Sequence, residues 1–252
     1  MDTLDLEKIS IVSTNLAELR EYFIKILAKA GKPALIITFN LEFFRNALIN
    51  EEFNSICKQA ELVLPDGISI THFLKLKYKK NINRVTGNDL FELILSLSSD
   101  IPLRIAFVGS SKKVISELTA KISSLYPNCR IAAAISPPYN FELDKDENNS
   151  VLEELIKVKP DVLFLALGNP RQELWLDKHK DQIGARINIG VGAVFDFYTG
   201  NKKRSPLIFQ KLSLEWAWRL LQEPKRLYKR YLIQGIPFFL RKAIQIIFKN
   251  DI

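Results

Sequence analysis

The stretch DVLFLALGNPRQELWLDKHKDQI, residues 161–183, joins an apolar run to a polar helical pattern through a single glycine. The run at 161–168 is typical of a strand buried on both faces of a sheet, and the pattern at 172–183 is typical of an amphipathic helix. A strand that leads through a short turn into a helix is the repeating unit of α/β proteins. The stretch therefore predicts a mostly parallel sheet covered by helices.

The same alternation extends in both directions along the chain. Five further apolar runs are predicted to be strands: ALIIT (34–38), ELVL (61–64), LRIAFVG (103–109), RIAAAI (130–135) and ARINIGVG (185–192). Helices are predicted at 16–30, 41–59, 68–80, 89–98, 112–126 and 150–158, with a loop at 136–149. The predicted fold is α/β, with a mostly parallel Rossmann-like sheet flanked by helices and a helical C-terminal end.

Composition excludes several classes of protein. The chain has 252 residues, of which 47% are apolar and 25% charged, which is ordinary for a globular protein and unlike a disordered or collagen-like chain. Its cysteines are Cys57 and Cys129 and its histidines are His72 and His179, too few for a disulfide framework or a histidine-rich metal site. We therefore expect no metal and no cofactor.

The N-terminal sequence gives no targeting signal. It reads MDTLDLEKIS, which is acidic and lacks the basic and apolar regions of a signal peptide, so a cytoplasmic protein is expected. Nowhere does the chain contain the run of about 18 uninterrupted apolar residues that is typical of a membrane-spanning helix.

The excess positive charge lies at the C-terminal end. The whole chain has a formal charge of +8, and residues 201–252 alone carry 12 basic and 3 acidic residues. We therefore divide the chain into a nearly neutral body, 1–200, and a basic appendage, 201–252, which reads as two or three amphipathic helices. Aromatic residues alternate with cations at 215–232, which suits a membrane interface or single-stranded nucleic acid. The apolar run at 236–248 favours the membrane, or packing against the body or a second subunit.

Polar residues follow the predicted strands where ligands bind in parallel sheets. Thr38 and Asn40 end one strand, and Asp66 follows another in Pro-Asp-Gly. That tripeptide is also an ordinary turn, but a carboxylate there can act as a general base toward a substrate hydroxyl. Arg84 precedes a predicted helix start at Asn88 or Asp89, where it is either a surface cation or a partner for a diphosphate.

Two glycine-containing segments follow later strands. Gly168 and Gln172 lie in LALGNPRQE, and Gly190 and Gly192 precede Asp196 in IGVGAVFDFYTG. LALGNPRQE and the earlier FVGSSKK (107–113) match neither a dinucleotide nor an ATP-hydrolysis motif, so each is a glycine turn before a helix N-terminus that suits an anion, or a turn that serves packing alone. The two glycines of IGVGAVFDFYTG allow the close approach of a ligand or of a helix. Asp196 would accept hydrogen bonds from a base or ribose, or cap a turn.

Taken together and in order, several segments resemble the WecG/TagA/CpsF glycosyltransferase family. They are TFN (38–40), LVLPDGISI (62–70), RVTGNDL (84–90), LALGNPRQE (165–173), IGVGAVFDFYTG (189–200), KRSP (203–206) and LEWAWRLLQEPKRLYKRY (214–231). The resemblance implies an inverting, metal-independent transferase that moves an N-acetylmannosamine-like sugar from a UDP-sugar to an undecaprenyl-diphosphate-linked sugar. It also implies a peripheral location on the inner face of the cell membrane, and a role in cell-surface polysaccharide synthesis.

The resemblance also implies roles for particular residues. Asp66 matches the general base and Arg84 the diphosphate-stabilising arginine, while Thr38 and Asn40 match residues of the sugar pocket. The remaining matches are Tyr139, Gln172 and Asp196 on the nucleotide side, and Arg219, Arg226 and Lys229 in the appendage. Gly168, Gly190 and Gly192 are expected to bind substrate because they lie at strand ends.

Two positions depart from the family pattern. Lys229 stands where an arginine is expected, and SPPYNF (136–141) differs from the Gly-Tyr-Phe loop of several members and is closer to the exopolysaccharide branch. Expected partners are the donor, the lipid-linked acceptor and an anionic membrane surface, without nucleic acid, and a homo-oligomer that covers the apolar end of the chain is a further expectation. The alternative function is nucleic-acid binding through the basic aromatic end of the chain.

Overall fold

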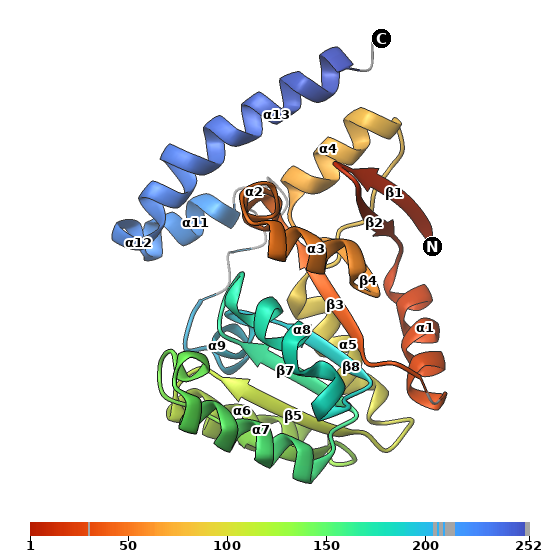
Figure 1. Ribbon diagram of the computed structural model, residues 1–252, viewed down its shortest axis with the longest axis vertical. Helices are drawn as coiled ribbons and strands as arrows, with labels where there is room; N and C mark the ends of the chain where they lie inside the picture. Colours follow the sequence, from red (N-terminus) through yellow and green to blue (C-terminus); the bar gives the residue numbers. More distant parts are fainter. Residues whose placement is uncertain (30, 204–205, 207–208, 210–214, 250–252) are drawn as a thin grey trace.

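The computed structural model in Figure 1 describes residues 1–29, 31–203, 206, 209 and 215–249, except for the side chains of Arg219, Arg226 and Lys249. Its centre is a six-stranded sheet in the order β4-β3-β8-β7-β5-β6, in which every neighbouring pair is parallel. The strands are β3 (Ala34–Phe39), β4 (Leu62–Pro65), β5 (Arg104–Gly109), β6 (Arg130–Ile135), β7 (Val162–Ala166) and β8 (Ile187–Gly190). The predicted parallel α/β sheet is confirmed.

Helices cover both faces of this sheet. Alternate residues of one strand enter different clusters, as Ile36 of β3 packs with one layer of helices and Ile37 with the other. One layer contains α1 (Leu16–Ala28), α5 (Gly87–Leu97), α6 (Lys112–Leu125) and α9 (Val194–Thr199). The other contains α2 (Leu41–Ile49), α3 (Glu51–Gln59), α4 (Ile68–Tyr78), α7 (Lys145–Val158) and α8 (Arg171–Ile183). Burial on both faces explains why the strands are continuous apolar runs.

Three of the expected helices have other boundaries in the structure. The helix predicted at 41–59 is two helices, because Asn50 leaves helical geometry and its side chain caps α3 through the Phe53 N–H. Helix α7 begins at Lys145 because Asp144 caps it. Helix α5 starts after Thr86 instead of at Asn88 or Asp89. The short helix α9 was not predicted.

An N-terminal hairpin was also missed. Strands β1 (Asp2–Leu6) and β2 (Ile9–Ser13) pair antiparallel around a turn at Glu7 and Lys8, both of which have positive φ angles. Lysine and glutamate are uncommon in that backbone conformation, so the sequence carries no turn signal there.

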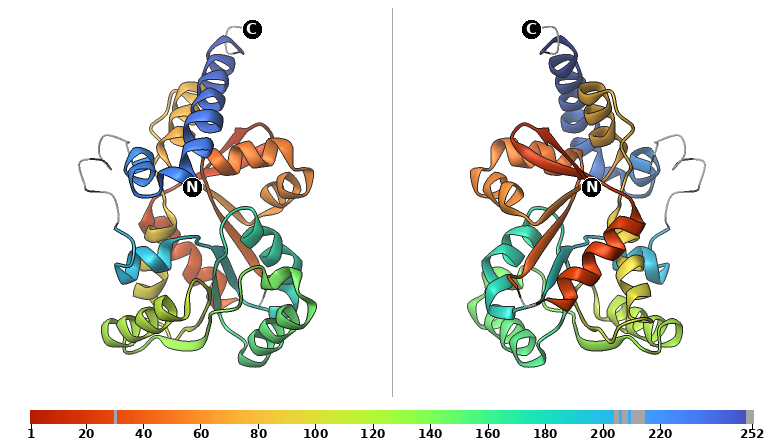
Figure 2. Two further views of the ribbon diagram at one scale, coloured as in Figure 1. Left: turned by 90° about the vertical axis from the view of Figure 1, so that its left-hand side faces the viewer. Right: turned by 90° about the vertical axis from the view of Figure 1, so that its right-hand side faces the viewer.

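The C-terminal end forms a series of helices at one end of the molecule, beside α4 (Figures 1 and 2). They are α11 (Glu215–Gln222), α12 (Pro224–Tyr228), a π-helical turn at Lys229–Gly235 and α13 (Ile236–Lys249). Phe238 packs edge-on against Phe44, and Phe239 stacks on Phe73, with ring centroids 5.4 and 5.0 Å apart. The predicted helical appendage is present and contacts the body through aromatic side chains.

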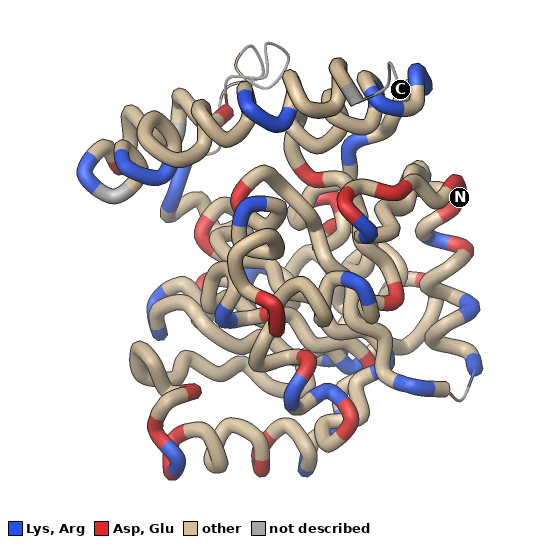
Figure 3. The backbone as a smooth tube through the Cα atoms, turned by 45° about the horizontal axis from the view of Figure 1, so that its top comes forward, with Lys and Arg blue, Asp and Glu red and all other residues tan. Residues whose placement is uncertain are grey.

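Among the residues that the structure describes, one helix, Lys229–Phe248, is long and apolar enough to cross a membrane, judged by length and composition alone. Counting uninterrupted apolar residues did not reveal it, because Arg230, Arg241 and Lys242 interrupt the run. Figure 3 shows basic positions along these C-terminal helices.

Candidate active site at the strand ends

The carboxyl ends of four strands surround a cavity of about 370 Å³, which we call the strand-end cavity. Thr38 lies in β3, Asp66 follows β4, Gly168 follows β7 and Gly190 ends β8. Its lining also includes Asn40, Phe43, Thr86, Gly87, Asn88, Asn169, Gln172, Gly192, Asp196, Lys202, Lys203, Glu215 and Arg230. Residues that are far apart in the sequence therefore meet where parallel sheets bind ligands.

Backbone hydrogen bonds hold Asp66 in place. Its N–H donates to the Phe39 carbonyl at 2.9 Å, and the Pro65 carbonyl accepts from the Val85 N–H at 3.0 Å. The turn that carries the carboxylate is thus fixed to β3 on one side and to the segment after Arg84 on the other. Gly67 completes the turn with φ +89°, a conformation that favours glycine.

The N-terminus of α5 supplies a site for an anion. Thr86 caps it by accepting from the Asp89 N–H at 3.2 Å, and the Asp89 carboxylate accepts from the Thr86 N–H at 2.8 Å. Gly87 and Asn88 form the first turn and line the cavity. N–H groups in a first helical turn carry partial positive charge and bind phosphate-like groups.

A buried network lies beneath the other wall. Gln172 Oε1 accepts from the N–H groups of Gly168 and Gly192, each at 3.0 Å, and its Nε2 donates to Glu173 at 2.6 Å. The N–H groups of Gly168 and Gly192 therefore both donate to Gln172. Burial raises the pKa of the Glu173 carboxyl to about 7. Glu173 was not among the predicted site residues.

A second cavity, of about 420 Å³, adjoins the first, and we call it the tail cavity. The two share Asn40, Asp66, Glu215 and Arg230 in their linings. The tail cavity is further lined by Leu41, Glu42, Arg45, Gly67, Ile68, Ser69, Arg84, Trp216, Tyr231, Gly235, Ile236 and Phe239. Roughly half of its wall therefore comes from the C-terminal helices, and much of that half is apolar.

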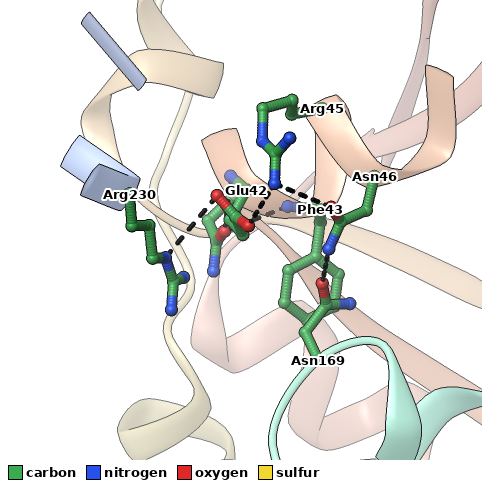
Figure 4. A network of polar contacts seen from close by, with 7 residues as sticks. Glu42, Phe43, Arg45, Asn46, Asn169 and Arg230 are labelled. Carbon is green, nitrogen blue, oxygen red and sulfur yellow. Dashed lines mark hydrogen bonds and ion pairs between the residues drawn. The ribbon is translucent and has the colours of Figure 1, made fainter. Parts of the chain in front are cut away.

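Ion pairs connect the body to these helices at the tail cavity. Arg84 pairs with Glu215 of α11 at 2.8 Å, and both side chains are partly exposed. Figure 4 shows Glu42 of α2 between Arg45 and Arg230, at 2.8 and 3.5 Å. Arg84 lines the tail cavity together with Asp66, and a phosphate that reached Arg84 would compete with the Glu215 carboxylate.

The remaining predicted residues are placed as follows. Asp196 lines the strand-end cavity and accepts from the Ser110 hydroxyl at 3.2 Å. Tyr139 is 86% exposed and lies against the Arg171 guanidinium, outside both cavities. Lys229 is exposed on the π-helical turn and lines neither cavity. Arg219 and Arg226 fall on α11 and α12, but their side chains are outside the described part of the structure.

The described residues contain no group of three or more histidine, cysteine, aspartate or glutamate side chains that could hold a metal ion. Cys57 and Cys129 are buried, and burial raises the pKa of both thiols, so neither has the character of a nucleophile.

Comparison with known proteins identifies the family. The model of the glycosyl transferase WecG/TagA/CpsF family matches residues 4–251. The chain belongs to this family. It is a glycosyltransferase.

Several curated relatives of this WecG/TagA/CpsF member carry one name, N-acetylglucosaminyldiphosphoundecaprenol N-acetyl-beta-D-mannosaminyltransferase. The protein from Bacillus spizizenii is 30% identical over 245 residues, which cover 97% of this chain and 92% of the relative. The Bacillus subtilis protein is 32% identical, with 92% and 88% covered. The Staphylococcus aureus MW2 protein is 27% identical, with 82% and 78% covered.

Sequence reasoning missed several residues of the WecG/TagA/CpsF site. Thr86 and Asn88 carried a usable signal, because a threonine three residues before an aspartate marks a helix cap. Glu42, Arg45, Trp216 and Tyr231 carried none, since their position depends on how the C-terminal helices pack.

Proposed function

We propose that this glycosyltransferase moves an N-acetylmannosamine-type sugar from a uridine diphosphate sugar to a sugar linked to undecaprenyl diphosphate, in cell-surface polysaccharide synthesis. The donor binds in the strand-end cavity and the acceptor sugar enters from the tail cavity. One observation carries the proposal: Asp66 lines both cavities. The names of the relatives support the acceptor and the transferred sugar.

The proposed step is a single displacement at the anomeric carbon. Asp66 takes the proton of the acceptor hydroxyl as its oxygen attacks, the bond to the donor diphosphate breaks, and the diphosphate leaves with the bonding electrons. One displacement inverts the configuration, so an α-linked donor yields a β product, in agreement with the β linkage in the relatives' name.

Protein groups, without a metal ion, stabilise the leaving diphosphate in this proposal. The first turn of α5 lines the strand-end cavity, Arg230 lines both cavities, and Arg84 lines the tail cavity together with Asp66. A group that stabilises charge in the transition state typically contributes about 3 kcal/mol. Activity in excess chelator supports this reading, and its loss, restored by added Mg²⁺ or Mn²⁺, contradicts it.

We further propose that the C-terminal helices form an appendage that lies on an anionic membrane surface. One side of α13 packs on the body through Phe238. The opposite side exposes an apolar stripe, which we call the tail stripe: Ile233, Ile236, Leu240, Ile244, Ile247 and Phe248. The first five positions recur at intervals of three and four, and Phe248 lies four residues after Ile244, so they share one helix face.

The packing of α13 favours an interfacial helix over a spanning one. A helix that crossed the bilayer would have to separate Phe238 and Phe239 from the aromatic rings of α2 and α4. A helix parallel to the surface keeps these contacts and buries the tail stripe in the headgroup region. Exposed Lys225, Lys229 and Arg241 supply cations for anionic lipids. The enzyme would then act from the cytoplasmic face, where its acceptor is anchored.

The donor can be tested by thermal shift. A panel of uridine and guanosine diphosphate sugars is added to the full chain, because a ligand that binds only the folded state raises its melting temperature. The proposal expects the largest rise with a uridine diphosphate N-acetylhexosamine and transfer from it to a synthetic polyprenyl-diphosphate N-acetylglucosamine. Rises with guanosine diphosphate sugars alone, or binding without transfer, would contradict it.

A further inference from the structure

Gln172 and Glu173 connect the ends of two neighbouring strands. Gly168 follows β7 and Gly192 follows β8, and both of their N–H groups donate to the same oxygen, Gln172 Oε1. The segments that carry them line the strand-end cavity. One side chain amide therefore fixes the spacing of two loops that form a wall of that cavity.

The carboxylate of Glu173 fixes the orientation of that amide. Gln172 Nε2 donates to Glu173 Oε1 at 2.6 Å, and Asn169 Nδ2 donates to Glu173 Oε2 at 3.0 Å. Because both backbone N–H groups need an acceptor, the Gln172 oxygen must face them and its NH₂ group must face Glu173. Gln172 and Glu173 are 2% and 1% exposed, so water does not compete for these bonds.

The neighbouring residues leave room for this arrangement and extend it. A Cβ atom at Gly190 would lie 2.5 Å from both Gln172 Nε2 and Glu173 Oε1, so a side chain there would displace this pair. Asn169 Oδ1 in turn accepts from Asn46 Nδ2 at 2.6 Å (Figure 4). The absence of a side chain at Gly190 thus serves the Gln172–Glu173 pair.

We propose that Glu173 is a positioning residue for donor binding, which acts through Gln172 to hold the Gly168 and Gly192 loops at the spacing that the donor requires. The inference deepens the proposed function and rests on it for the identity of the donor. Glu173 itself touches no substrate, because it is buried behind Gln172 and is not part of the cavity lining.

Two substitutions separate this role from general stability. Glu173→Leu removes both acceptors and leaves the Gln172 NH₂ group without a partner, so the amide is free to turn away. Glu173→Gln keeps one acceptor oxygen for Gln172 Nε2, and its NH₂ group is accommodated if Asn169 and Asn46 turn over. Asp181→Leu, at an exposed aspartate of the same helix, is the matched control.

The first measurement is hydrogen exchange in the full chain, which does not depend on the donor. We expect Glu173→Leu to raise amide exchange about tenfold or more in peptides that cover Gly168 and Gly192, because a buried hydrogen bond to a charged group is lost. Glu173→Gln and Asp181→Leu should leave exchange within about threefold of wild type. Unchanged exchange in Glu173→Leu would overturn the proposal.

The second measurement is steady-state transfer with a uridine diphosphate sugar. Glu173→Leu should raise the donor KM about tenfold with little change in kcat. Glu173→Gln should have a donor KM close to that of wild type. The double variant Gln172→Leu/Glu173→Leu should be no worse than Gln172→Leu alone, because Glu173 acts through Gln172. Additive losses would overturn the proposal. Failure of wild type to bind uridine diphosphate would contradict the proposed function, while hydrogen exchange would still decide the positioning role.

Discussion

The strand-end cavity and the tail cavity differ in what holds them together. The first is built on a six-stranded sheet, with loops fixed by buried hydrogen bonds of Gln172 and Glu173. The second closes where the C-terminal helices meet the body, through the aromatic contacts of Phe238 and Phe239 and the partly exposed ion pairs of Arg84 and Glu42. Exposed ion pairs contribute little to stability and are screened by salt. Buried hydrogen-bond networks are screened much less.

The difference indicates that donor binding and acceptor binding depend on different parts of the enzyme. A preformed site favours binding of a small soluble donor, because few protein groups have to become ordered when it binds. An acceptor anchored in a membrane must be reached from the surface, and the wall that faces it is on the same helices as the tail stripe. Donor binding should therefore be independent of the membrane, and transfer should not.

The largest expected effect is at the junction of the two cavities. Asp66→Asn should reduce transfer by about a hundredfold or more, because a general base is lost, while donor affinity in the strand-end cavity stays within about threefold. Transfer is measured with a synthetic lipid acceptor and donor affinity by calorimetry.

Glu215→Gln is the matched control for Asp66→Asn, since Glu215 is the other carboxylate that lines both cavities. It should lose the ion pair with Arg84 and keep most of the activity. If Glu215→Gln were as inactive as Asp66→Asn, or if Asp66→Asn were nearly fully active, Asp66 would not be the base.

Substitution of Arg84 tests whether a cation on the tail-cavity side serves the reaction. Arg84→Ala should lower kcat by about 30-fold or more and leave donor affinity unchanged, because the lost charge acts mainly in the transition state. Arg84→Lys should recover only part of the rate, since lysine lacks the planar fork of the guanidinium. A loss confined to donor KM would assign Arg84 to the strand-end cavity instead.

The tail stripe provides the next test, because it should matter for the lipid acceptor and not for the donor. Leu240→Glu/Ile244→Glu places two charges on positions that are each 54% exposed, so folding should be unaffected. Binding to phosphatidylglycerol vesicles should fall at least tenfold, since burial of one such side chain contributes about 2 kcal/mol. Transfer to the lipid acceptor should fall with it.

Gln245→Glu adds a charge at an exposed position of the same helix outside the tail stripe, and should bind vesicles nearly as wild type does. Vesicle binding unchanged in the double variant would contradict the membrane proposal. A change of oligomeric state in sedimentation, without any vesicle binding by wild type, would assign the stripe to a second copy of the chain.

Local patterns were sufficient to predict the central fold. Each strand was an apolar run, because parallel strands covered on both faces have no polar alternation, and DVLFLALG gave β7 almost completely. The β1–β2 hairpin escaped because its turn uses Glu7 and Lys8 at positive φ. The break at Asn50 escaped because asparagine is tolerated within helices, and only the structure shows that it caps α3.

The site was predictable only where it is local. Thr38, Asn40 and Asp66 stand at strand ends, so the sequence placed them near each other, and all three line the strand-end cavity. That Asp66 separates two cavities depends on the docking of the C-terminal helices, which no pattern in the body specifies. The role of Glu173 also escaped, since a glutamate in the first turn of a helix ordinarily faces solvent.

The smallest effect on transfer is expected from Glu173→Gln, which instead should change how stability depends on pH. In the folded chain burial raises the pKa of Glu173 to about 7 from its usual 4.5, so between these values unfolding releases a proton and stability falls as pH rises. Over this interval the carboxyl should cost about 3 kcal/mol, at about 1.4 kcal/mol per pH unit. A glutamine does not titrate, so Glu173→Gln should gain stability relative to wild type by about that amount between pH 4.5 and 7.5.

Urea unfolding of both proteins at each pH measures this gain, and the difference between them removes the contribution of other groups. The titratable neighbour that Glu173 affects is Cys57 on α3, whose pKa is raised by burial and by the Glu173 charge, so it does not titrate within the interval. Parallel stability curves would show that Glu173 is ionised throughout, as a solvated carboxylate would be. The hydrogen bonds beneath the strand-end cavity would then be exposed to water. The two cavities would no longer differ in the burial of the groups that hold them together.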